Sequence, residues 1–125
     1  STNGASELTY NPTVITDISS EMDIAHEEIF GPIATIFTFK DEADVIRQAN
    51  DTIYGLAAYF YSGSYARSWR VTEGLEYGII GHNTGLISTE VAPFGGVKQS
   101  GFGREGSKYG IEEYVVTKYW CSDVS

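Results

Sequence analysis

The sequence predicts an α/β fold with a parallel βαβαβ core. Three short strand patterns, at 33–39, 56–61 and 78–82, are separated by two stretches whose apolar residues have helical spacing. Strands and helices that alternate at this spacing are typical of right-handed crossovers between parallel strands. Hydrophobic residues make up 42% of the 125 residues, which is enough to form the core of one compact domain.

Two short elements are predicted before the first helix. The β-branched residues at 12–16 predict an extended segment, and a helical turn over 21–27 follows it. Gly31 and the proline after it would stop that turn. The sequence IATIFTF at 33–39 alternates, which predicts a strand with one set of residues on one side: Ile33, Thr35, Phe37 and Phe39.

Both predicted helices have an N-terminal cap in the sequence. Asp41 caps a helix that ends near Asn50. The residues of this helix that we expect to be buried have helical spacing: Val45, Ile46 and Ala49. Ser64 caps the second helix, which we expect to end at Gly78. The inward candidates of this helix are Trp69 and Leu75.

The remaining strands and loops follow from apolar runs and glycines. LAAYFY at 56–61 is short and continuously apolar, as expected for a strand buried on both faces. GIIGH at 78–82 predicts the next strand, and a long loop rich in turn residues follows over 83–103. A helix is predicted near 104–109. YVVTKYWC at 114–121 then predicts a terminal strand, which could complete its own sheet or extend that of another chain.

Charge and cysteine content exclude several classes of partner. Acidic residues outnumber basic ones 17 to 8, for a formal net charge of −9. This balance argues against nucleic-acid and membrane partners, since both need clustered Lys and Arg. No apolar run approaches the roughly 18–20 residues of a membrane span, and the N-terminus lacks the apolar core of a signal peptide. The single cysteine, Cys121, suits a reducing cytosol, so we expect a cytoplasmic location.

Three local signals favour structural roles over chemistry. GFGREG at 101–106 fits the dinucleotide pattern G-x-G-x-x-G, but VKQS precedes it in place of a buried strand, which favours tight turns. His26 and His82 are too few and too isolated for a zinc site, so no metal is expected. Cys121 lies in a Tyr- and Trp-rich segment, which favours a small packed side chain over a nucleophile.

Three longer sequences are more specific: EEIFGP at 27–32, NDTIYGLAAYFYS at 50–62 and NTGLISTEVAPFGGVKQSGFGREGSKYGIEEY at 83–114. Together they closely resemble the C-terminal part of the aldehyde dehydrogenase superfamily. GLIS followed by APFGGVKQSG and GREGSKYG resembles the succinate-semialdehyde dehydrogenase group. The resemblance covers about 10–119. It implies that the whole chain is a fragment of the aldehyde dehydrogenase catalytic domain without a separate linker, and that 112–121 is an oligomerisation strand.

The resemblance implies roles for five residues. Glu28 would bind the nicotinamide-ribose hydroxyls of NAD or NADP, because a carboxylate accepts two hydrogen bonds from a vicinal diol. Phe30 would pack by the nicotinamide. Ser88 would donate a hydrogen bond to the distal carboxylate of the substrate, and Phe94 would line the substrate tunnel. Asn83 would support the active-site loop. Without the motif, Glu28 is a solvated or capping acid.

The resemblance also implies what this chain leaves out. The family's nucleophilic Cys, its general-base Glu, its Rossmann-type domain and its substrate-binding arginines would all lie upstream of EEIFGP. No residue here is therefore assigned as catalytic, and we expect the chain alone to be inactive and to bind no cofactor. A small aldehyde would bind only in the intact enzyme. His82, where an apolar residue is usual, and Ile53, in place of a turn residue, depart from the family pattern.

Two other functions stay open. The first is a free-standing, non-enzymatic module derived from that enzyme. It would form homo-oligomers through exposed apolar surface and its terminal strand. The second is a nucleotide-binding module that uses GFGREG at 101–106.

Overall fold

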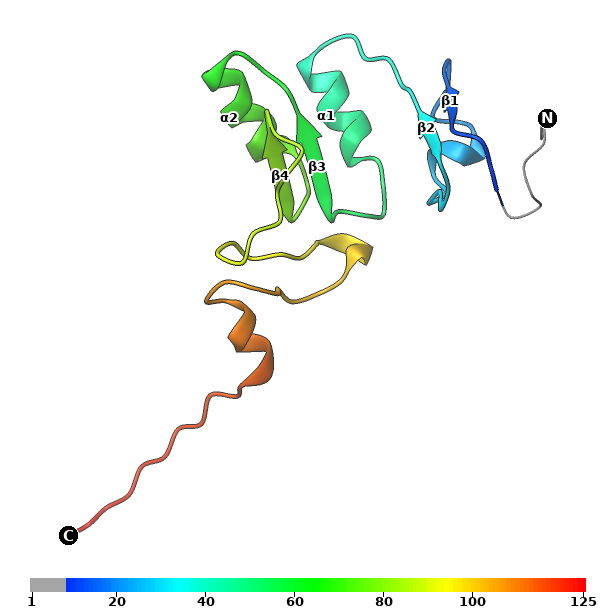
Figure 1. The fold of residues 1–125 in the computed structure, drawn as a ribbon. Helices are drawn as coiled ribbons and strands as arrows, with labels where there is room; N and C mark the ends of the chain where they lie inside the picture. The colour runs from blue at the N-terminus through cyan, green and yellow to red at the C-terminus, as the bar shows by residue number, and fades with distance from the viewer. Residues whose placement is uncertain (1–8) are drawn as a thin grey trace. The chain divides into compact units, whose positions relative to one another are not determined.

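The computed structural model describes residues 9–125, which divide into two compact units, one up to Val45 and one from Ile46 (Figure 1). Each unit contains one parallel pair of strands: β1 with β2, and β3 with β4. The strands and helices of the predicted βαβαβ pattern are therefore present. They are hydrogen-bonded as two parallel pairs in place of one continuous sheet.

The first unit contains β1 (Thr13–Ile15), the 3-10 helix η1 (Asp23–Ala25) and β2 (Ile33–Thr35). These elements confirm the extended segment predicted at 12–16 and the helical turn predicted over 21–27. β2 is shorter than the predicted strand, since β1 ends opposite Thr35 and the ladder stops there. Phe37 and Phe39 lie beyond β2 and are exposed, so their predicted place on one strand face is wrong.

The first helix forms where the sequence predicts it. α1 (Glu42–Asn50) begins after Asp41, whose Oδ1 accepts a hydrogen bond from the N–H of Asp44 at 2.9 Å. This contact satisfies one of the backbone donors that a helix leaves open at its N-terminus. The residues of the predicted stripe are half-buried: Val45, Ile46 and Ala49.

The second unit contains a βαβ crossover. β3 (Ala57–Phe60), α2 (Tyr65–Gly74) and β4 (Ile79–His82) follow one another, and the two strands pair in parallel. Ser64 caps α2 as predicted, because its side chain accepts from the N–H of Arg67 at 3.4 Å. The helix ends at Gly74, before the predicted Gly78. It ends there because Leu75 adopts an extended conformation, with ψ 130°.

Two predictions of burial are wrong. The sequence predicts that LAAYFY at 56–61 is buried on both faces, but Tyr59 is 49% exposed and Tyr61 is 73% exposed. Among residues 9–125, β3 pairs with β4 alone, and a two-stranded sheet leaves much of its surface open to solvent. Trp69 is 62% exposed, since the inner face of α2 carries Ser68 and Val71, which are buried. Residue 69 lies about 100° around the helix from residue 68, so its side chain points away from this buried face.

The glycine-rich segment after β4 is held by short elements. It contains η2 (Lys98–Ser100), an antiparallel bridge between Phe94 and Glu105, and η3 (Gly110–Tyr114). The helix predicted near 104–109 is wrong, because Glu105 is engaged in that bridge and turns follow it. Within residues 9–125, no helix is long and apolar enough to cross a membrane.

The C-terminal segment, 115–125, has no assigned helix or strand. The predicted strand at 114–121 is therefore absent from the described chain, where neither pair of strands extends to this segment. Its apolar side chains are open to solvent: Val116 is 95% exposed and Trp120 is 84% exposed. The assignment of 112–121 as an oligomerisation strand stays a prediction.

Candidate functional site

The loop that carries most of the predicted site residues begins at Asn83, directly after β4. Asn83 adopts a left-handed backbone conformation with φ 56°, which asparagine tolerates better than most residues. Its Oδ1 accepts from the N–H of Ser62 at 2.9 Å, and its Nδ2 donates to the Ser62 carbonyl at 2.9 Å. Ser62 lies just beyond β3. Asn83 therefore holds the carboxyl ends of the two strands together at the start of the loop.

His82 reinforces the same junction. Its ring stacks on Phe60 with centroids 4.9 Å apart, and its Nε2 lies 2.8 Å from Ser68 Oγ and 3.1 Å from the Ser62 carbonyl oxygen. The Ser68 hydroxyl donates to the Ser64 carbonyl at 2.9 Å. Nε2 must then carry the proton and donate to both oxygens. This departure from the family pattern is therefore accommodated by specific hydrogen bonds.

Ser88 and Phe94 lie further along the loop. Ser88 is exposed, and its neighbour Ile87 packs against Gly81 of β4, where an added Cβ would lie 2.9 Å from Ile87 Cγ2. The backbone of Phe94 is fixed by two hydrogen bonds with Glu105, at 2.8 and 2.7 Å. The ring of Phe94 is 37% exposed. The loop is thus anchored on both sides of Ser88 while the two site side chains stay accessible.

The GFGREG sequence forms tight turns, as predicted. Its three glycines adopt left-handed conformations: Gly101 with φ 110°, Gly103 with φ 79° and Gly106 with φ 66°. Nη1 of Arg104 donates to the carbonyls of Gly96 at 2.8 Å and Gly103 at 2.7 Å. A dinucleotide fingerprint needs a strand before it and an α-helix after it. Here η2 precedes the sequence and turns follow it, so the nucleotide-binding interpretation is not supported.

The predicted cofactor residues belong to the first unit, between η1 and β2. Glu28 is exposed, and the ring of Phe30 is 92% exposed. Both side chains are therefore available to a ligand. Asn83, Ser88 and Phe94 belong to the second unit.

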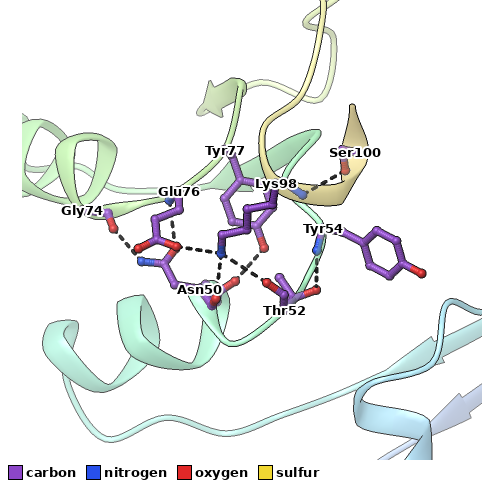
Figure 2. A network of polar contacts seen from close by, with 10 residues as sticks. Asn50, Thr52, Tyr54, Gly74, Glu76, Tyr77, Lys98 and Ser100 are labelled. Atoms are coloured by element: carbon purple, nitrogen blue, oxygen red, sulfur yellow. Dashed lines mark hydrogen bonds and ion pairs between the residues drawn. The ribbon is translucent and has the colours of Figure 1, made fainter. Parts of the chain in front are cut away.

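A polar network that sequence reasoning missed lies at the amino ends of β3 and β4. Figure 2 shows its contacts converging on the ammonium of Lys98, which donates to the carbonyls of Asn50 at 2.9 Å and Thr52 at 3.2 Å. The same ammonium pairs with the Glu76 carboxylate at 2.7 Å. The Asn50 amide donates to the Gly74 carbonyl and accepts from the Glu76 N–H, at 2.7 and 2.9 Å.

Comparison with known proteins decides the family. The model of the aldehyde dehydrogenase family matches residues 1–120. This chain belongs to the aldehyde dehydrogenase family. The resemblance to this family, based on the sequences at 27–32, 50–62 and 83–114, is therefore confirmed.

The individual relatives include succinate-semialdehyde dehydrogenases. The mitochondrial enzyme of Arabidopsis thaliana is 66% identical over 112 residues, which cover 90% of this chain and 21% of the relative. The crystal structure of succinate-semialdehyde dehydrogenase from Burkholderia pseudomallei matches with a TM-score of 0.85 and 63% identity, over 90% of this chain and 23% of that one.

A more distant relative was solved with a cofactor. Betaine aldehyde dehydrogenase from Staphylococcus aureus, in complex with NAD+, matches with a TM-score of 0.85 and 44% identity, over 89% of this chain and 22% of that one. The chain thus spans about a fifth of the length of the relatives that it matches.

Proposed function

We propose that this chain supplies part of the cofactor and substrate walls of an NAD(P)-dependent succinate-semialdehyde dehydrogenase. The observation that carries the proposal is the anchored loop between Asn83 and Phe94. The Asn83 side chain holds it at the carboxyl end of β4 and backbone hydrogen bonds hold it at the Phe94–Glu105 bridge, while Ser88 between them is exposed. A loop held on both sides can present a side chain in a reproducible position.

Ser88 and Phe94 suit a small aldehyde with a distal carboxylate. The Ser88 hydroxyl would donate a hydrogen bond to that carboxylate, and Phe94 would form an apolar wall beside the reacting end. Ser88 brings no positive charge, so the charge that balances the carboxylate would come from arginines outside this chain.

Glu28 and Phe30 fit the nicotinamide half of the cofactor. An exposed carboxylate can accept two hydrogen bonds from the ribose hydroxyls, and the open ring of Phe30 can pack beside the nicotinamide. The bound cofactor supplies the hydride acceptor for aldehyde oxidation. The role of Glu28 is to orient the ribose, and with it the nicotinamide, in the intact enzyme.

We further propose that the chain alone is inactive and that it acts in the cytoplasm. Covalent aldehyde oxidation needs a nucleophile held beside a base. The single cysteine, Cys121, is exposed in the segment that has no assigned helix or strand. One cysteine offers no partner for an internal disulfide, which suits a reducing compartment.

The test is a chimera in which residues 9–120 replace the matching segment of the Burkholderia pseudomallei enzyme. We expect the chimera to oxidise succinate semialdehyde with NAD+ or NADP+, with kcat/KM within about tenfold of the parent. Ser88→Ala in the chimera should raise the KM for succinate semialdehyde by about tenfold and leave that for butanal unchanged, since butanal lacks the carboxylate. A folded chimera without activity would contradict the proposal.

The role of Glu28 is tested by Glu28→Gln in the same chimera. We expect the KM of the dinucleotide to rise by about tenfold, because hydrogen bonds to an ionised acceptor are stronger than those to a neutral amide. Glu27→Gln is the matched control, since Glu27 is also exposed and carries the same charge. Equal effects of the two substitutions would show that net charge matters and that Glu28 has no specific role.

Self-association is a second candidate function, favoured by the C-terminal segment. Val116, Tyr119 and Trp120 are each at least 84% exposed there, and the extended backbone can pair with another strand. We expect light scattering to show dimers or larger species of the full chain, and deletion of 115–125 to reduce them. A monomer at micromolar concentration would exclude this function.

A further inference from the structure

Lys98 has a backbone conformation that its residue type does not favour. Its φ is 55°, in the left-handed region, where a Cβ crowds the following carbonyl. Glycine adopts this conformation freely, whereas a lysine does so only with strain. A residue in a strained conformation persists where its surroundings hold it in place. The contacts of the Lys98 side chain are therefore the place to look for what holds this conformation.

The ammonium of Lys98 is held by three partners, although the residue as a whole is exposed. The side chain is 25% exposed, and its ammonium contacts two carbonyl oxygens and one carboxylate. One of these carbonyls belongs to Asn50, the last residue of α1, where the helix dipole favours a cation. The same carbonyl also accepts from the N–H of Thr52 at 2.8 Å. The carboxylate belongs to Glu76, beyond the end of α2. Lys98 thus ties η2 to the ends of both helices.

The segment tied in this way lies against the entry to β3. The N–H of Val97 donates to the Gly55 carbonyl at 3.0 Å, and the N–H of Gln99 donates to the Ile53 carbonyl at 2.9 Å. The Gly55 N–H in turn donates to Ser100 Oγ at 2.9 Å. Phe94 lies three residues before Val97, so the placement of this segment limits where Phe94 can lie.

We propose that Lys98 is a positioning residue for Phe94. Its ammonium clamps 97–100 to the ends of α1 and α2, and this clamp fixes the bridge between Phe94 and Glu105. Only the assignment of Phe94 to a substrate wall rests on the proposed function. The clamp is a property of this chain and is tested without aldehyde oxidation.

The experiment measures hydrogen exchange of single backbone amides by NMR in the full chain. In Lys98→Met, we expect exchange at Phe94, Val97 and Gln99 to accelerate by about tenfold to a hundredfold. This range corresponds to the stabilisation that hydrogen bonds from a charged donor provide. The Ile79 amide, which donates to the Leu56 carbonyl at the start of β4, should keep its rate. Lys98→Arg should restore protection, since a guanidinium also donates to carbonyls. Equal acceleration at Ile79 would overturn the proposal, because it would indicate a loss of global stability alone.

Lys98→Gly separates the ammonium from the backbone conformation. It relieves the left-handed strain, so it is expected to fold even if Lys98→Met does not. We expect it to accelerate the same amides as Lys98→Met. The proposal would be overturned if the amides of Val97 and Gln99 exchanged as slowly as in the unmodified chain, or more slowly. An inactive chimera would leave this outcome unaffected, so the two proposals fail separately.

Discussion

Gly78→Ala is expected to destabilise the βαβ unit strongly. A Cβ at position 78 would collide with the carbonyl oxygen of Gly95 and would lie 2.9 Å from the Cα of Gly96. Both are backbone atoms, and the next residue, Val97, is hydrogen-bonded to Gly55, so the segment cannot retreat freely. We expect a loss of about 3 kcal/mol or more in the free energy of unfolding. Urea unfolding followed by circular dichroism measures it.

Gly85→Ala is the matched control for this substitution. A Cβ at Gly85 meets nothing within 4 Å, and its backbone is not left-handed. We therefore expect a change within about 0.5 kcal/mol in the free energy of unfolding. A loss at position 85 as large as that at position 78 would show that the close approach of Gly95 and Gly96 is not the cause.

The elements that could be predicted from the sequence are those with local causes. Asp41 and Ser64 each cap a helix through contacts within three residues, and those contacts form as expected. The parallel crossover from β3 through α2 to β4 follows from spacing and handedness alone. Left-handed turns at the GFGREG glycines, 101–106, likewise need no distant partner.

The wrong predictions concern structural features that depend on partners elsewhere in the chain. The length of β2 is set by where β1 ends, which its own alternation does not reveal. The exposure of Tyr61 depends on what covers β3, and an apolar run does not show how many layers surround it. The helix predicted near 104–109 is lost because Glu105 pairs with Phe94, which is 11 residues away in the sequence.

The same distinction applies to the candidate site. Support of the active-site loop by Asn83 stays a prediction, and its side chain forms two hydrogen bonds with the Ser62 backbone at the start of that loop. The Lys98 network was missed, because Lys98 and Asn50 are separated by 48 positions and each resembles an ordinary polar surface residue in the sequence. The local signal was weak: an asparagine at the end of a helix is compatible with a cap, but it does not identify its partner.

Asn50→Ala is expected to have the second largest effect on stability. The Asn50 amide bridges the end of α2, since it donates to the Gly74 carbonyl and accepts from the Glu76 N–H. Alanine removes both hydrogen bonds and leaves the partly buried Gly74 carbonyl without the Asn50 amide as its donor. We expect a loss of about 2–3 kcal/mol in the free energy of unfolding, the sum of two bonds and their desolvation. Urea unfolding again measures it.

The comparison with Asp51→Ala identifies the cause of that loss. Asp51 is the exposed neighbour of Asn50, and the backbone hydrogen bond from its N–H to the Gln48 carbonyl survives the substitution. A change within about 0.5 kcal/mol is therefore expected for Asp51→Ala. If Asn50 acts through its amide, Asn50→Ala should also speed exchange of the Glu76 amide, which loses its acceptor. A destabilised Asn50→Ala variant with an unchanged Glu76 amide would assign the effect to α1 and not to the bridge between the helices.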